Sequence, residues 1–532
     1  MIKNFKWLLL VSLTFVACNS DIDEGVIVEQ EVPIVPGSAD FSKFVALGNS
    51  LTAGFSDNAL FIAGQTNAYP KLMADQFALA GGGEFKIPFM NDNTGGLLIG
   101  GSLYPNNGFL PRLVIDGFVN GSPNIKSLIQ APFNKLPTTE TLNVVAGPFN
   151  NLGVPGAKSF HLLASGYGNP ANLPAAANPY FIRMASSPTT SIIADALAQS
   201  PTFFSLWIGN NDVLGYALSG GTGVNQTGNV NPATYGGNDI SDPGVFASVY
   251  ETLINALTAN GAKGVVANLP NVTSLPYFTT VPTNAVPGLP PANAAQLNQL
   301  FGGINQALTA SGLPTRFSLL TADDGNAATV ERNPLLIRDE SLTNTAALIT
   351  AVLTPSLGAP TATFLGSIYG QARHAVNDRA MPSTRDFIVL PARSIIGTAQ
   401  PSIPAPFNAI GVSFPMQDSA ALTATEALEI ITATAAFNTS IKTIAEAKGL
   451  AFVDVNAILR QVASGGVRFN NFTMSSSFIT GGAFGLDGVH VTARANSYIA
   501  NQFLMAINTT YGSTLRMYKP GDFPLIYPPS LQ

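Results

Sequence analysis

Residues 44–54 read FVALGNSLTAG and have the pattern of a strand that runs into a helix. The first four residues form a short apolar run that Gly48 ends, which is typical of a buried β-strand. Ser50 follows two residues later, where a helix can begin. A strand that leads directly into a helix indicates an α/β protein, in which the two kinds of element alternate.

The same alternation continues along the chain. Further apolar runs predict strands at 142–145, 203–208, 264–269 and 451–455, and apolar residues at helical spacing predict helices at 69–80, 191–199, 245–260, 425–448 and 492–508. A loop is expected between the strand at 451–455 and the last helix. Short apolar strands between helices predict a parallel sheet covered by helices on both faces. Large loop-rich insertions are expected to interrupt this domain, which spans 41–510, at about 76–142, 216–245 and 279–423. Residues 511–532 are expected to form a C-terminal tail.

The composition excludes some classes of protein. Of the 532 residues, 46% are hydrophobic and only 11% are charged, which is too apolar for a disordered chain. The formal net charge is -6 and no long basic run occurs, so nucleic-acid binding is not expected, since phosphate contacts need clustered Lys and Arg. The single cysteine rules out an intrachain disulfide and a cysteine-based zinc site.

That cysteine, Cys18, lies where a signal peptide would end. Lys3 and Lys6 precede a short apolar stretch at 7–16, so residues 1–17 are predicted to be a signal peptide. The sequence FVAC at 15–18 resembles the lipobox of bacterial lipoproteins, although Phe15 stands where Leu is more usual. The alternative is an ordinary secretory signal followed by a cysteine by chance.

Lipidation of Cys18 would leave residues 18–40 as an acidic, proline-containing tether. The acidic residues directly after Cys18 resemble the export tag of Bacteroidetes surface lipoproteins. We therefore expect an outer-membrane lipoprotein, exposed on the cell surface and held to the membrane by its N-terminal lipid. No later segment has about 18 continuous apolar residues, so no internal membrane helix is expected.

Three short polar segments follow predicted strands, where open α/β sheets bind ligands. Ser50 can present its hydroxyl at a strand-to-helix turn, Gly156 in 151–156 can bring its N–H close to a reacting oxygen, and Asn211 in 209–212 can donate an amide hydrogen to a developing oxyanion. Asp212 is placed to hold that amide. Each segment also fits a simpler role, as a helix cap or a polar turn.

A fourth segment supplies a base. Asp487 and His490 are three residues apart, and residues at this spacing share a face on a helical turn. The carboxylate can therefore orient an imidazole whose other nitrogen accepts a proton. The other two histidines, His161 and His374, lack an acidic residue three positions upstream and are predicted to be structural or exposed. The simpler interpretation of the pair is a surface Asp and a His that caps the last helix.

Taken in order, the four segments resemble the signature blocks of the SGNH (GDSL-like) hydrolases. Gly-Asn-Ser-Leu at 48–51 resembles the first block, Asn-x-Gly-x-x-Gly at 151–156 the second, Gly-Asn-Asn-Asp at 209–212 the third and Asp-x-x-His at 487–490 the last. The resemblance covers about 230 residues and leaves the insertions at 76–142 and 279–423 unexplained.

The resemblance implies a three-layer α/β/α, flavodoxin-like fold and a hydrolase of carboxylic esters. Ser50 would be the nucleophile, His490 its base and Asp487 the group that orients His490. The N–H groups of Ser50 and Gly156 and the side chain of Asn211 would form the oxyanion hole. No metal or organic cofactor is implied.

Two positions depart from the family pattern. Asn49 replaces the Asp of the Gly-Asp-Ser-Leu sequence, and Val491 replaces a Pro that often follows the block histidine. The Asp is generally a local structural group, and the Pro affects the stiffness of a loop. We expect activity to survive both changes.

The substrate class stays open. The same scaffold serves esterases and lipases that bind acyl chains and esterases that deacetylate glycans, and fold alone does not choose between them. Apolar insertion segments such as 346–349 slightly favour acyl chains, although apolar segments more often form a core. A third alternative is a non-catalytic surface protein that binds glycan or lipid.

Overall fold

The computed structural model describes residues 33–104, 108–119, 121–326, 328–376, 384–469 and 471–531. The expected signal peptide and Cys18 lie outside these ranges. The chain from Ile34 onward forms one compact unit.

A parallel sheet lies at the centre of this unit. Within the described ranges its strand order is β6-β1-β7-β8-β15, and all neighbouring strands run parallel. The strands are β1 (Phe44–Gly48), β6 (Asn151–Gly153), β7 (Phe203–Trp207), β8 (Lys263–Ala267) and β15 (Ala451–Val453). Because β6 and β7 lie on opposite sides of β1, the strand order reverses at β1, and the carboxyl end of β1 is the position where sheets of this kind bind ligands.

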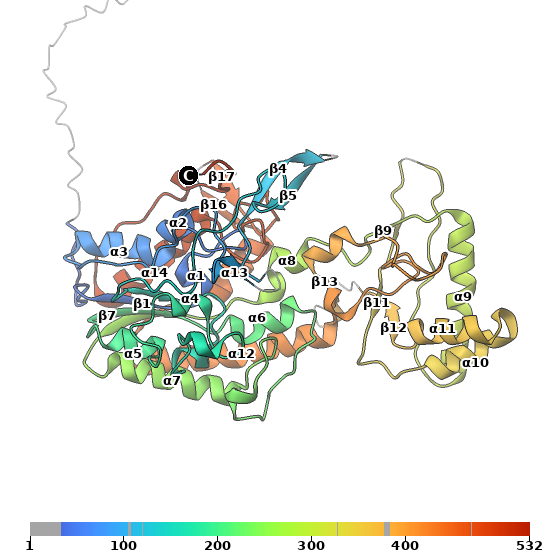
Figure 1. Cartoon of the computed structure of the whole chain (residues 1–532), viewed down its shortest axis with the longest axis horizontal. Coiled ribbons are helices and arrows are strands. Elements are labelled where there is room, and N and C mark those ends of the chain that lie inside the picture. Colours follow the sequence, from blue (N-terminus) through green and yellow to red (C-terminus); the bar gives the residue numbers. More distant parts are fainter. Residues whose placement is uncertain are drawn as a thin grey trace, which may run out of the picture. The chain divides into compact units, whose positions relative to one another are not determined.

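Two layers of helices cover the sheet (Figure 1). On one face α3 (Tyr69–Leu79) packs against α14 (Ala493–Tyr511), and on the other α12 (Ala424–Ala447) packs against α7 (Pro243–Thr258), with α5 (Ile192–Leu197) beside α7. The predicted α/β class and the parallel sheet are therefore confirmed.

Local sequence signals explain where these helices begin. Thr423 and Glu426 form a reciprocal capping box at the start of α12, and Thr492 caps α14 through the N–H of Ala495. Gly512, with φ of 70°, ends α14 in the left-handed conformation that glycine adopts without strain. The predicted boundaries at 425–448 and 492–508 therefore differ from the observed ones by one to three residues.

Two segments differ from the sequence-based expectation. Residues 142–145 form no strand, because their side chains are mostly exposed; the strand that pairs with β1 is β6 itself. The region after 455, predicted as a loop, begins with helix α13 (Val455–Ser464). Asp454 caps this helix by accepting a hydrogen bond from the N–H of Ala457, and the strand β15 ends two residues earlier than predicted.

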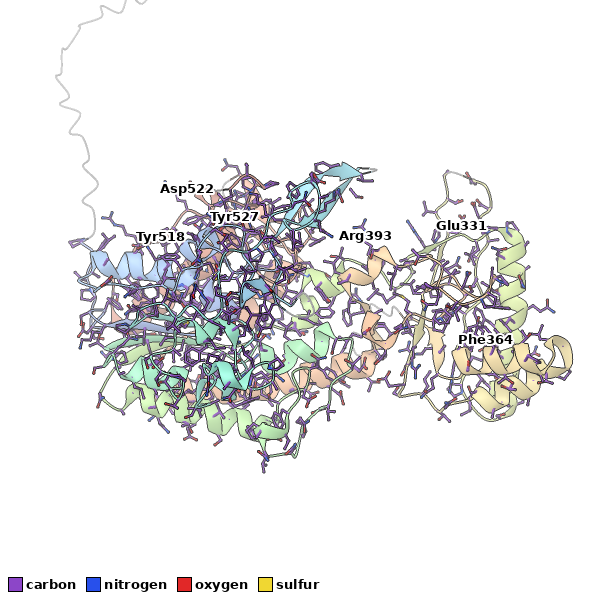
Figure 2. All side chains as sticks on the ribbon, in the orientation of Figure 1. Glu331, Phe364, Arg393, Tyr518, Asp522 and Tyr527 are labelled. Atoms are coloured by element: carbon purple, nitrogen blue, oxygen red, sulfur yellow. The ribbon has the colours of Figure 1, made fainter. Side chains whose placement is uncertain are left out.

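The first insertion is tied to the C-terminal segment. It contains a hairpin of β4 (Leu113–Val119) and β5 (Ser122–Ser127), preceded by the fully buried Arg112. The Arg112 guanidinium donates hydrogen bonds to the carbonyls of Tyr527 and Pro528, so the segment expected as a tail packs on the rest of the unit. Tyr518 and Tyr527, labelled in Figure 2, also donate to backbone carbonyls, those of Leu72 and Ala63.

The insertion at 279–423 has a hydrophobic cluster of its own. Three helices build it: α9 (Pro291–Ala310), α10 (Ala346–Leu357) and α11 (Ala359–Tyr369). Residues 346–349 start α10, and Ile349 is buried in this cluster. That segment is therefore part of a core, which was the more ordinary of the two interpretations of its apolar sequence.

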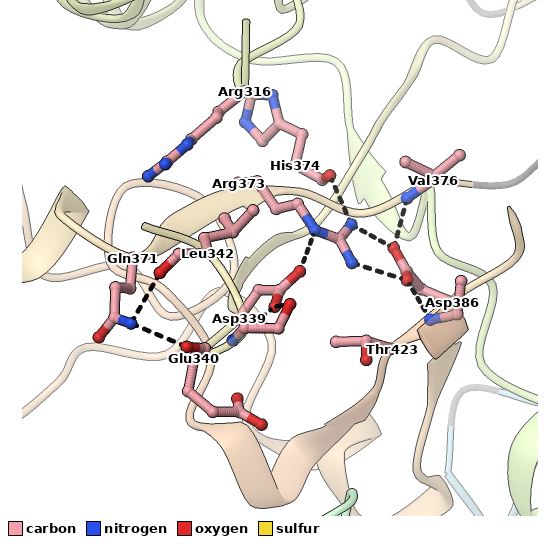
Figure 3. A network of polar contacts seen from close by, with 12 residues as sticks. Arg316, Asp339, Glu340, Leu342, Gln371, Arg373, His374, Val376, Asp386 and Thr423 are labelled. Carbon is pink, nitrogen blue, oxygen red and sulfur yellow. Dashed lines mark hydrogen bonds and ion pairs between the residues drawn. The ribbon is translucent and has the colours of Figure 1, made fainter. Parts of the chain in front are cut away.

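An ion-pair network joins this insertion to the start of α12 (Figure 3). Arg373 lies between two carboxylates, 2.6 Å from Asp339 and 2.5 Å from Asp386. Asp386 also accepts hydrogen bonds from the backbone N–H groups of Val376 and Ala424. Burial alone would lower the pKa of Arg373, but both carboxylates hold it above its usual value. The insertion is thus fixed to the first turn of α12.

The remaining elements are short. They are the helices α1 (Ser50–Ala53), α2 (Ile62–Thr66), α4 (Pro179–Ile182), α6 (Asn211–Leu218) and α8 (Pro276–Thr279), and the strands β2 (Leu98–Ile99), β3 (Ser102–Leu103), β9 (Val286–Pro287), β10 (Arg332–Asn333), β11 (Leu336–Arg338), β12 (Ala372–His374), β13 (Phe387–Ile388), β14 (Ala421–Leu422), β16 (Val467–Phe469) and β17 (Phe472–Met474). In the part of the chain that the structure describes, no helix has the length and hydropathy needed to cross a bilayer.

Candidate active site

Ser50 is the first residue of α1, directly beyond the carboxyl end of β1. Asn49, which is 1% exposed, caps this short helix, because its side-chain oxygen accepts a hydrogen bond from the N–H of Leu51. Ser50 itself is therefore not the cap, and its hydroxyl is available for other contacts. An aspartate oxygen would serve equally as this cap, which explains why Asn is compatible with the turn.

The Ser50 hydroxyl meets the imidazole of His490. Ser50 Oγ lies 2.9 Å from His490 Nε2, and His490 Nδ1 lies 2.8 Å from Asp487 Oδ2. The structure thus brings together the three residues that the sequence proposed as nucleophile, base and orienting acid. The ring of Phe55 covers the imidazole, with ring centroids 4.6 Å apart.

Asp487 is held by several N–H groups. Its Oδ1 accepts hydrogen bonds from the backbone of Val489 and of His490, and its Oδ2 accepts one from the N–H of Asn58. Residues 487–490 form a turn with Gly488 at φ of 71°, and not the helical turn that the three-residue spacing suggested. The turn brings the carboxylate and the imidazole into contact all the same.

These donors keep Asp487 ionised. Burial alone would raise the pKa of this carboxyl, but the interaction with His490 and the hydrogen bonds from Val489 and His490 outweigh it, so the pKa lies below its usual range. A carboxylate at neutral pH fixes the proton of His490 on Nδ1 and leaves Nε2 as the acceptor that faces Ser50.

Asn211 shares a cavity with Ser50 and His490. It begins α6, and its side-chain NH₂ donates a 2.9 Å hydrogen bond to the carbonyl of Ala157. This bond uses one of the two amide hydrogens and fixes the orientation of the amide. The second hydrogen remains for a ligand, which is the role that the sequence proposed for Asn211.

Gly156 precedes Ala157 in the turn after β6 and has φ of 82°. This left-handed conformation is unstrained for glycine and strained for other residues. Among the described residues, no protein atom accepts a hydrogen bond from the backbone N–H of Gly156 or of Ser50. Gly156 is not among the residues that line the cavity, and the bond between Asn211 and Ala157 connects its turn to the site.

Asp212 supports this turn indirectly. Its fully buried carboxylate accepts hydrogen bonds from the backbone N–H and the hydroxyl of Ser159, 2.8 and 2.7 Å long. The expected direct contact with the Asn211 amide is not made. Asp212 instead fixes Ser159, which lies two positions after Ala157. The carbonyl of Ala157 accepts the hydrogen bond from the Asn211 amide.

The other two histidines have structural contacts. His161 Nδ1 accepts the N–H of Lys158, and His374 Nδ1 accepts the N–H of Ser318. Burial lowers the pKa of each to about 4, so both stay neutral near pH 7. His374 is buried and His161 is half-buried, and neither lines the cavity at Ser50.

The sequence did not single out Asp57, a buried carboxyl behind the triad. Asp57 Oδ1 accepts the N–H of Leu486 at 2.7 Å, and the next residue, Asn58, donates to Asp487. Both Asp57 and Asn58 have positive φ, a conformation that Asp and Asn adopt more readily than most residues. The Asp-Asn pair shortly after Ser50 is the only sequence signal of this turn, and it gives no hint of its distant partner.

Asp57 makes the stability of the fold depend on pH. Burial raises the pKa of Asp57 to about 7, while in the unfolded chain the proton is lost near pH 4. The unfolded state therefore binds fewer protons between these pH values, and stability falls as pH rises through this window. One pKa unit corresponds to about 1.4 kcal/mol. Between pH 4 and pH 8 the free energy of unfolding of Asp57→Asn should therefore rise by up to about 4 kcal/mol relative to that of the wild type.

Urea unfolding of both proteins at these pH values measures the difference. Asn143→Ala, an exposed amide, serves as the control and should follow the wild type throughout. If the free energies of unfolding of the wild type and Asp57→Asn change in parallel with pH, the pKa of Asp57 is not raised in the folded state.

Acidic groups that could hold a metal ion lie elsewhere. In the described ranges they are Asp323 with Asp324 and Glu331, and Glu340 with Asp418 and Glu426. Neither group includes a residue of the Ser50 site. The chemistry available at that site is therefore that of a serine, an imidazole, a carboxylate and an amide.

Comparison of the chain with family models, with curated proteins and with solved structures gives no match.

Proposed function

We propose that this protein is a serine hydrolase of carboxylic esters of the SGNH type. The hydrogen-bonded chain from Ser50 through His490 to Asp487 is the observation that carries the proposal. A serine hydroxyl is a weak nucleophile until a base accepts its proton, and here the base lies within hydrogen-bond distance and is itself oriented by a buried carboxylate.

The proposed reaction has two stages. Ser50 Oγ attacks the ester carbonyl while His490 Nε2 takes the hydroxyl proton, and His490 then gives that proton to the leaving alcohol. In the second stage His490 activates water, which releases the acid from Ser50. Asp487 stabilises the imidazolium that forms in both stages.

The negative oxygen of each tetrahedral intermediate needs donors that are already in place. The free hydrogen of the Asn211 amide and the unused N–H groups of Ser50 and Gly156 are the candidates. Donors fixed before the reaction cost no reorganisation, and one such donor is typically worth about a hundred- to a thousandfold in rate.

The strand order also supports the proposed fold family. Numbered along the chain, the five parallel strands lie in the order 2-1-3-4-5, which is the flavodoxin-like order of doubly wound sheets. Ser50 then lies beyond strand 1, at the position where such sheets bind their ligands.

A serine-reactive fluorophosphonate probe tests the proposal on the full chain. We expect a single labelled peptide that contains Ser50, because only an activated serine reacts quickly with such probes. Heat-denatured protein is the control and should stay unlabelled. A folded protein that takes up no label would contradict the proposal and favour a non-catalytic binding protein.

A further inference from the structure

An apolar cavity lies beside the Ser50 hydroxyl. Ser50 and His490 line one part of it, and its apolar walls include two helices, α13 with Val455, Leu459 and Val462 and α14 with Ala495 and Ile499. None of the residues of the insertion at 279–423 that the structure describes lines it. The cavity is therefore built by the same unit that carries the triad.

Helix α13 presents a continuous apolar face to this cavity. Val455, Leu459 and Val462 are spaced i, i+4 and i+7, so they share one side of the helix, and all three are buried. Asp454 fixes the start of the helix, because it accepts hydrogen bonds from Ala457 N–H and from the Asn268 side chain beyond β8. The wall is thus anchored to the sheet before any ligand binds.

Polar groups gather where the reaction takes place. Apart from Tyr498, the polar side chains that line the cavity are Ser50, His490, Asn211 and the asparagines that precede Ser50 and Asn211 in the chain. An ester whose carbonyl meets Ser50 can therefore place its acyl chain along the apolar walls. Such a chain would move from water onto apolar side chains, and this burial of apolar surface favours binding.

The cavity has room for a chain longer than an acetyl group. The centres of water-sized molecules can reach about 90 Å³ of it. A cavity that just holds one water molecule has about 10–15 Å³ of occupied space, so several methylene groups fit here in sequence. An acetyl group would leave most of the cavity empty.

The geometry points to an acyl-chain site beside Ser50 that makes the enzyme prefer esters with an acyl chain of several carbons, such as hexanoate and octanoate, to acetate esters. This inference rests on the proposed hydrolase function and names its substrate class. An acetylated glycan fits less well, because sugar rings need an open aromatic face. Trp207, which lines the cavity, is 2% exposed, and its N–H is bound to the Asn268 carbonyl.

The test measures kcat/KM of the full chain on p-nitrophenyl acetate, butyrate, hexanoate, octanoate and dodecanoate. Each buried methylene can add up to about fourfold, so hexanoate or octanoate should exceed acetate by at least about tenfold, and dodecanoate shows how far the site extends. The highest value on acetate would overturn the acyl-chain site and leave the hydrolase proposal standing. No hydrolysis of any ester, with no label on Ser50, would overturn the hydrolase proposal itself.

A variant that fills the cavity tests its position. Ala495→Leu adds a branched side chain to the wall on α14 and should lower the ratio of kcat/KM for octanoate to that for acetate by at least about tenfold. Ala435→Leu is the matched control, because Ala435 is exposed on helix α12, and it should keep the wild-type ratio. An unchanged ratio in a folded Ala495→Leu protein would place the acyl chain elsewhere.

A second measurement covers the case in which Ala495→Leu does not fold. The wild-type protein is inactivated with p-nitrophenyl phosphonates that carry an ethyl or an octyl chain. The octyl compound should label Ser50 at least about tenfold faster, since its chain takes the place of the acyl group. Equal rates would overturn the inference.

Discussion

Ser50→Ala should lower kcat for p-nitrophenyl hexanoate by about four to six orders of magnitude. The alanine has no oxygen to form the acyl-enzyme, so only the rate that comes from binding and the oxyanion donors remains. The substitution should leave the fold intact, because Asn49 and not Ser50 caps α1, and because the change removes one atom from a small side chain.

The measurement compares initial rates of the variant and the wild type, with thermal unfolding to show that both are folded. Ser367→Ala, an exposed serine on α11, is the control and should keep full activity. More than about 1% of wild-type kcat in the Ser50 variant would exclude Ser50 as the nucleophile, since loss of a triad serine costs far more.

Asp487→Asn should lower kcat by about ten-thousandfold. Four N–H groups surround the carboxylate: those of Asn58, Val489 and His490 in the backbone, and Nδ1–H of the imidazole. An amide has only one oxygen for these donors, so its NH₂ group must face an N–H or the ring. If that group faces the ring, the proton of His490 moves to Nε2. That nitrogen can then no longer accept the proton of Ser50.

The expected loss lies in kcat more than in KM, because the cavity that binds the ester is unchanged. Asp75→Asn on α3 removes an exposed carboxylate paired with Lys71 and is the control, expected to behave as the wild type. A folded Asp487→Asn protein within tenfold of wild-type kcat would show that Asp487 does not orient the base.

The sequence predicted those elements whose signals are local. The helix at 425–448 has a capping box at Thr423 and a glycine after its last turn, and β1 is an apolar run that Gly48 ends. Helix α13 was missed because its first residue, Val455, continues the apolar run of β15. Its cap, Asp454, and the spacing of Val455, Leu459 and Val462 were the signals that identify it.

Contacts between residues that are far apart in the chain could not be predicted from the local sequence. Nothing near Asp57 in the sequence indicates its bond to Leu486, which is 429 residues away. The core formed by α9, α10 and α11 likewise depends on which apolar faces meet, and helical spacing does not give the partner of a face. The grouping of Ser50 with His490 followed from a resemblance of short motifs, and the cavity beside them came only from the structure.

The distance along the chain between Ser50 and His490 has a consequence for synthesis and folding. These two side chains touch across 440 residues, and the turn that carries His490 lies directly before the last helix, α14. Contacts of such high sequence separation form late and slowly, and chains are made from the N-terminus onward. A nascent chain shorter than 490 residues thus contains the serine without its base. Ester hydrolysis during refolding should therefore report the docking of the last segment.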